Sequence, residues 1–140
     1  MKTGETVETG KTGIRVLLAD DHALFRQGVR RLLEQAGDIE VVGEAGSGEQ
    51  TVQLVEHLVP DIVLLDVAMP TVSGIDAARM IKASSPRAGI IMLTVHDDHD
   101  KIFEAICAGA SGYLLKNSSR QTITTAIQDV LSGGAAMHAA

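Results

Sequence analysis

The stretch PDIVLLDVAMPTVSGIDA, residues 60–77, contains one complete step of the predicted fold. Pro60 ends a preceding helix, because proline has no backbone N–H to donate and clashes with the turn before it. Ile62–Leu65 is a short, continuous apolar run, which is typical of a strand buried on both faces of a parallel sheet. Asp66 ends that run, and Ile75–Ala83 comes next with the spacing of a helix. The stretch therefore predicts a strand, a loop and a helix, with a carboxylate at the end of the strand.

The same step occurs five times along the chain. The other predicted strands are Ile14–Ala19, Ile39–Glu44, Gly89–Leu93 and Gly112–Leu115. The other predicted helices are Ala23–Ala36, Glu49–Leu58 after a Ser47 cap, Lys101–Ala108, and a last helix that Ser118 caps and Gly133-Gly134 ends. Five β–α units in succession predict a doubly wound α/β domain with one parallel sheet and right-handed crossovers. The pattern alone does not give the strand order.

Apolar spacing also predicts which side of each late helix faces the core. The inward residues expected are Ile102, Ala105 and Ile106 on one helix, and Ile123, Ile127, Val130 and Leu131 on the next. Residues 1–13 are polar, rich in Gly and Thr, and predicted to be a disordered leader. The domain is expected to span residues 14–132, and residues 133–140 to begin a linker.

Composition narrows the classes of function. The formal net charge of −6 disfavours direct binding of DNA or RNA by this domain, because an acidic surface repels phosphate backbones. Cys107 is the only cysteine, so no internal disulfide can form. No apolar run approaches the roughly 20 residues that span a bilayer. We therefore expect a cytoplasmic protein that does not enter the membrane.

Four predicted strands end in a charged or hydroxyl side chain: Asp20 with Asp21, Asp66, Thr94 and Lys116. Ligands of open parallel sheets bind beyond the carboxyl ends of the strands, so these groups should share one crevice. Three carboxylates repel one another unless a cation is present, and Mg²⁺ prefers oxygen ligands. A nucleophilic carboxylate, a cation pair and a hydroxyl are the parts that phosphoryl transfer needs.

The sequence resembles the receiver domain of response regulators, in particular its NarL/FixJ (LuxR-type) subfamily, from about Ile14 to Leu131. The segments that carry the resemblance are RVLLADDHALFRQGVRRLL (15–33), PDIVLLDVAMPTVSGIDA (60–77), IIMLTVHDD (90–98) and GASGYLLK (109–116). The resemblance implies a five-stranded parallel sheet in the order 2-1-3-4-5, with helices on both faces.

It also implies a role for each site residue. Asp66 would accept the phosphoryl group. Asp21 would bind Mg²⁺ directly, together with Asp66 and the backbone carbonyl of Ala68, while Asp20 would hold a metal-bound water. Lys116 would pair with the phosphoryl group.

The same resemblance implies roles for three further positions. Thr94 would move to hydrogen-bond the phosphoryl group, and Tyr113 would follow it inward. His96 lies two residues beyond Thr94, and we expect it to modulate the rate of dephosphorylation. None of the five histidines forms a recognisable pattern of metal ligands.

The family implies a sensor histidine kinase as phosphoryl donor, and a helix-turn-helix output domain that would bind DNA after Ala140. It implies a switch rather than a turnover enzyme. The first or fifth helix could pair two copies in a homodimer. The alternative is a standalone receiver, acting as a phosphate sink or protein-binding module, which differs only in lacking an output domain after Ala140.

Two unrelated functions fit the sequence less well. Phosphatases with an aspartate nucleophile carry a second Asp two residues on, where this chain has Ala68. A flavodoxin-like cofactor binder needs a Ser/Thr-rich phosphate loop after its first strand. Asp20 and Asp21 stand there instead, and would repel the phosphate.

Overall fold

Strands and helices alternate along the chain in the computed structural model, which describes residues 13–95, 99–133 and 136–138. The strands are β2 (Ile14–Ala19), β3 (Ile39–Ala45), β4 (Ile62–Asp66), β5 (Gly89–Thr94), β6 (Gly112–Leu115) and β7 (Ala136–His138). The helices are α2 (Ala23–Glu34), α3 (Gly48–Leu58), α4 (Gly74–Ser84), α5 (His99–Cys107) and α6 (Arg120–Leu131). Within these ranges no helix is long and apolar enough to cross a membrane. Apart from Gly13, the predicted leader lies outside the described residues.

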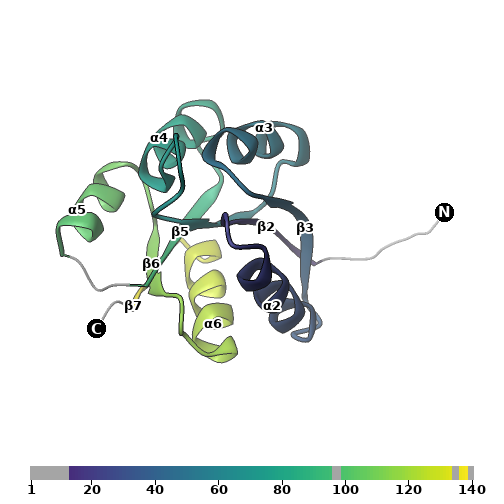
Figure 1. Ribbon diagram of the computed structural model, residues 1–140. Coiled ribbons are helices and arrows are strands. Elements are labelled where there is room, and N and C mark those ends of the chain that lie inside the picture. The colour runs from purple at the N-terminus through teal and green to yellow at the C-terminus, as the bar shows by residue number, and fades with distance from the viewer. Residues whose placement is uncertain (1–12, 96–98, 134–135, 139–140) are drawn as a thin grey trace.

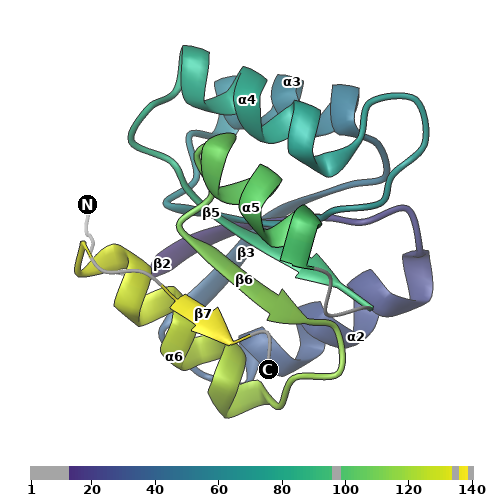
Figure 2. The same cartoon turned by 90° about the vertical axis from the view of Figure 1, so that its left-hand side faces the viewer.

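All strands pair in parallel in one sheet, in the order β3-β2-β4-β5-β6-β7 (Figures 1 and 2). Counted along the chain, the first five strands have the order 2-1-3-4-5, which confirms the predicted fold class. The order brings the carboxyl ends of β2, β4, β5 and β6 next to one another. These are the strands that carry the predicted site residues.

Both faces of the sheet are covered, which is why the strands are apolar throughout. Leu17 and Ala19 of β2 pack on the face covered by α3, α4 and α5, whereas Val16 and Leu18 pack on the face covered by α2 and α6 (Figure 1). Successive side chains of a strand point to opposite faces, so burial on both sides needs a continuous apolar run. The low aromatic content fits this core, which is built mainly of Val, Leu, Ile and Ala.

The short strand β7 was not predicted and lies where we expected a linker. It pairs with β6 from Gly112↔Ala136 to Leu114↔His138 (Figure 2). The four crossovers from β2 to β6 share one hand. The step from β6 to β7 continues in the same direction across the sheet, but its helix, α6, covers the opposite face from α4 and α5. This last crossover therefore has the other hand, against the usual right-handed rule.

Helix ends and faces agree with the sequence in most places. Ser47 caps α3 by accepting a hydrogen bond from the backbone N–H of Gln50, as predicted. The cap of α6 is Ser119 rather than Ser118, whose hydroxyl donates to the carbonyl of Leu115 instead. Ile106 and Leu131 were predicted to face the core but are largely exposed. Each lies in the last turn of its helix, where the inward positions are taken by the buried Ala105 on α5 and the half-buried Val130 on α6.

Gly74 begins α4 and lies against the end of β4. Its N–H donates to the carbonyl of Val67 at 2.9 Å. A Cβ at this position would clash with the carbonyl oxygen of Asp66 and lie 2.9 Å from the Cα of Val67. Only glycine fits there, so the loop between β4 and α4 closes tightly beside Asp66.

We predict that Gly74→Ala lowers the free energy of unfolding by about 2–3 kcal/mol, because the new methyl group meets backbone that cannot move aside. Gly28→Ala is the matched control, because a Cβ there meets nothing within 4 Å in the interior of α2. That change should raise stability by about 0.5–1 kcal/mol. Urea unfolding of both variants tests this, and equal stabilities would contradict the close approach.

Candidate functional site

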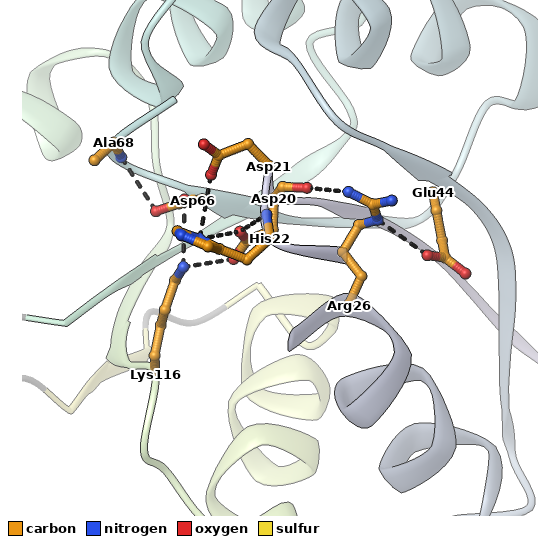
Figure 3. A network of polar contacts seen from close by, with 8 residues as sticks. All are labelled: Asp20, Asp21, His22, Arg26, Glu44, Asp66, Ala68 and Lys116. Atoms are coloured by element: carbon orange, nitrogen blue, oxygen red, sulfur yellow. Dashed lines mark hydrogen bonds and ion pairs between the residues drawn. The ribbon is translucent and has the colours of Figure 1, made fainter. Parts of the chain in front are cut away.

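The predicted site residues meet at the carboxyl edge of the sheet (Figure 3). Asp20 directly follows β2, Asp66 is the last residue of β4, and Lys116 directly follows β6. The Lys116 side chain points back toward both carboxylates. The parallel sheet thus brings together residues up to 96 positions apart in sequence, from 20 to 116.

Asp20 is only 2% exposed and is held by each of its polar groups. Its backbone N–H donates to the carbonyl of Ala45 at 3.0 Å. Its Oδ1 accepts the backbone N–H of His22 at 2.8 Å, and its Oδ2 lies 2.6 Å from Nζ of Lys116. A buried carboxylate needs such partners, because an unpaired charge away from water is very costly.

Asp66 is 3% exposed and lies beside the same lysine. Its Oδ2 is 3.3 Å from Nζ of Lys116, and its Oδ1 accepts the backbone N–H of Ala68 at 3.1 Å. Burial raises the pKa of the Asp66 carboxyl, and the negative charge of Asp20 raises it further, against the opposing effects of Lys116 and the Ala68 N–H. The contacts with Lys116 and the Ala68 N–H therefore do not fully offset the cost of burying the Asp66 negative charge beside Asp20.

Among the described residues, Lys116 is the only lysine or arginine whose charged group contacts these two carboxylates. Its side chain is 11% exposed, and its Nζ also lies 4.6 Å from the centre of the Phe25 ring. The aromatic face favours a cation and helps to hold the ammonium group in place. One lysine faces Asp20, Asp66 and the more exposed Asp21, so the cluster keeps a net negative charge.

The excess of carboxylates makes the edge a candidate metal site. Ligand atoms of Asp20, Asp21, His22 and Asp66 all lie within 4.8 Å of one another. Oxygen ligands at this density suit a hard dication such as Mg²⁺. The donor set therefore fits the predicted ion, and Lys116 contacts the two buried carboxylates of the same set.

The remaining predicted residues lie at or near the same edge, with one exception. Thr94 ends β5, and its carbonyl accepts the backbone N–H of Lys116 at 2.7 Å. Tyr113 is fully buried on the face of the sheet that α3, α4 and α5 cover. Ala68 contacts Asp66 through its N–H, and the role of its carbonyl stays a prediction. The exception is His96, which lies outside the described residues.

Two residues of the site were missed from the sequence. Nδ1 of His22 lies 3.3 Å from one oxygen each of Asp20 and Asp21, although no histidine showed a pattern of metal ligands. Arg26 donates to the backbone carbonyl of Asp20. The adjacency of His22 to the two aspartates was a usable signal. Arg26 gave none, because its contacts depend on how α2 lies across the end of β3.

Comparison with known proteins identifies the same kind of domain. Residues 16–128 match the family described as response regulator receiver domain. The transcriptional regulatory protein DegU of Brevibacillus brevis is 37% identical over 131 residues, which cover 94% of this chain and 56% of that protein. Response regulator UvrY of Escherichia coli (strain K12) is 45% identical over 120 residues, which cover 86% and 55%. The chain spans little more than half the length of these curated relatives.

Solved structures give the same result. The signal receiver domain of NarL from Mycobacterium tuberculosis superposes with a TM-score of 0.83 at 36% identity, covering 86% of this chain and 98% of that one. A LuxR-family two-component response regulator from Aurantimonas sp. SI85-9A1 superposes with a TM-score of 0.86 at 36% identity, covering 90% of both chains.

We predict that Asp66→Asn stabilises the protein at pH 7, raising the midpoint of thermal unfolding by a few degrees. The pKa of Asp66 is raised in the folded state, so its contribution to stability is fully present below the ordinary value of 3.8 and lost as pH rises through the folded pKa. The side-chain amide of the Asp66→Asn variant carries no charge, so the variant does not lose this stability as the pH rises. Lys116 keeps its ion pair with Asp20 in the variant.

The gain should shrink as the pH approaches 3.8. The exposed turn variant Asp38→Asn, measured beside it, controls for the loss of one acidic surface charge. A lower midpoint for Asp66→Asn at pH 7 would mean that the lysine fully compensates Asp66.

Proposed function

Because this chain belongs to the response regulator receiver family, of the NarL/LuxR type, we propose that Asp66 accepts a phosphoryl group from a sensor histidine kinase with the help of Mg²⁺. The observation that carries the proposal is the pair of contacts from Lys116 to Asp20 and Asp66. They put one fixed cation beside a buried, poorly compensated carboxylate at the open edge of the sheet.

The ion would be held by the carboxylates of Asp21 and Asp66 and the carbonyl of Ala68, with Asp20 holding a bound water. Bound there, Mg²⁺ supplies positive charge to the phosphoryl oxygens, as in other phosphoryl transfers. The chain's own residues do the rest. The Ala68 N–H and Lys116 fix the Asp66 carboxylate, and burial keeps water away from it.

The transfer is a substitution at phosphorus. An oxygen of Asp66 forms the new P–O bond while the P–N bond of a phosphohistidine breaks, and the electron pair stays on the imidazole nitrogen, which is protonated as it leaves. Phosphorus is neither oxidised nor reduced. Lys116 faces the charge that builds up on the phosphoryl oxygens. Slow attack by water on phosphorus later releases phosphate and restores the carboxylate. His96 would modulate the rate of that step.

The phosphoryl group would act as a switch through Thr94. Its hydroxyl would hydrogen-bond a phosphoryl oxygen in one position and not in the other, so phosphorylation shifts the population toward the first. Tyr113, already buried beneath this edge, would move with it and change the surface formed by α5, β6 and α6. The receiver would thus be a switch and not a turnover enzyme.

The output would be transcription, because the relatives DegU and UvrY are named as a transcriptional regulatory protein and a response regulator, and the parts that match this chain are only 56% and 55% of their lengths. A DNA-binding helix-turn-helix domain after Ala140 would carry that activity, and two copies would pair on DNA. A protein that meets both a kinase and a promoter in this way would act in the cytoplasm.

The test is the intact mass of the protein after incubation with Mg²⁺ and phosphoramidate. We expect a gain of one phosphoryl group that requires Mg²⁺ and is absent in Asp66→Asn. Asp76→Asn, on the exposed first turn of α4, should be phosphorylated like the wild type. A folded wild-type protein that binds Mg²⁺ but gains no mass from any small donor would refute the proposal.

A further inference from the structure

The side chain of Arg26 donates a hydrogen bond to the peptide group that joins Asp20 to Asp21. Nη1 of Arg26 donates to the carbonyl oxygen of Asp20 at 2.5 Å, and its Nε donates to Oε1 of Glu44 at 3.0 Å (Figure 3). The guanidinium thus spans from the end of β2 to β3, starting from the first turn of α2.

These contacts close a ring around Asp20. The residue after Glu44 is Ala45, whose carbonyl accepts the N–H of Asp20 at 3.0 Å. The end of β3 therefore holds Asp20 twice, directly through Ala45 and indirectly through Glu44 and Arg26. The carbonyl that Arg26 binds belongs to the same planar peptide as the N–H of Asp21. Fixing this peptide fixes the direction from which the Asp21 side chain leaves.

The ring is well ordered by burial and charge. The Arg26 side chain is only 19% exposed, and Glu44 is similarly covered. Hydrogen bonds from Arg30 and Arg26 lower the pKa of Glu44 despite its partial burial, so Glu44 stays ionised and keeps its hold on both arginines. The guanidinium group presents its N–H donors in a rigid planar fork, a fixed geometry that the ammonium group of lysine lacks.

We propose that Arg26 is a positioning residue of the dication site: it orients the Asp20–Asp21 peptide so that the Asp21 carboxylate faces the site. The proposal rests on the metal site of the proposed function, but not on phosphoryl transfer. Groups that hydrogen-bond to metal ligands without touching the metal commonly contribute about 10- to 100-fold to metal affinity.

Position and charge predict opposite results at Arg26, which makes the proposal testable. A cation near a dication site repels the ion, so removal of Arg26 would strengthen Mg²⁺ binding if its charge were all that mattered. Removal would weaken Mg²⁺ binding if the hydrogen bond from Arg26 to the Asp20 carbonyl mattered more. We infer that this hydrogen bond has the larger effect on Mg²⁺ affinity, because Arg26 donates directly to the metal-binding turn while its charge is already paired with Glu44.

The experiment is a calorimetric titration of the protein with Mg²⁺ alone. Arg26→Met should lower the affinity about tenfold. Arg26→Lys keeps the charge but loses the fork, so it should also lower the affinity, which a charge effect would not do. Arg30→Met is the matched control, because Arg30 also binds Glu44, at 2.8 Å, but makes no contact with Asp20. Its affinity should stay within about twofold of the wild type.

Unchanged or tighter binding in Arg26→Lys, or an equal loss in Arg30→Met, would overturn the proposal. If Arg26→Met does not fold, Arg26→Lys alone decides the question. A second readout is the Mg²⁺ concentration for half-maximal phosphorylation, which should rise in Arg26→Lys while the rate at saturating Mg²⁺ stays near that of the wild type. Wild-type protein that binds Mg²⁺ but takes no phosphoryl group would refute the proposed function and leave this inference standing. Wild-type protein that binds no Mg²⁺ would refute both.

Discussion

The ammonium group of Lys116 lies between the carboxylates of Asp20 and Asp66, and the rest of the site depends on this arrangement. Both carboxylates are almost fully buried, so they would be very costly without a cation. One lysine cannot balance them together with Asp21, and the remaining negative charge is what a dication would neutralise. The sheet makes the arrangement possible, because its strands are parallel and their order places the carboxyl ends of β2, β4 and β6 close together at one edge.

The surroundings hold this charged cluster still. Gly74 lets the loop after β4 close against Asp66, and the Ala68 N–H fixes one oxygen of that carboxylate. On the other side, Ala45 and Arg26 fix the backbone of Asp20. Asp21 is more exposed than either buried carboxylate. The site is therefore rigid around the two buried carboxylates and open where an ion and a phosphoryl group would enter, which limits the reorganisation that binding requires.

The sequence predicted the first five strands within a residue or two, because a sheet covered on both faces demands unbroken apolar runs that end where the sheet ends. The same ends located Asp20, Asp66, Thr94 and Lys116. The features that were not predicted from the sequence depend on how segments far apart in the chain pack together. The tail that forms β7 shows no hydrophobic period, and the strand is defined by its pairing with β6. Spacing alone does not show which residue of a last helical turn stays exposed, so Leu131 was placed inside while its neighbour Val130 packs on the core. Arg26 belongs to the site only because α2 crosses the end of β3.

Lys116, a monovalent cation, contacts the same carboxylates that a dication would share. The most direct test is the Mg²⁺ affinity of Lys116→Met, measured by calorimetry beside Lys101→Met on the exposed surface of α5. Removal of a cation in contact with both carboxylates should raise the affinity by about tenfold or more, while the Lys101 variant should match the wild type. An affinity that is unchanged or lower in Lys116→Met would show that the lysine does not share the metal's ligands, and the account of the site would be wrong.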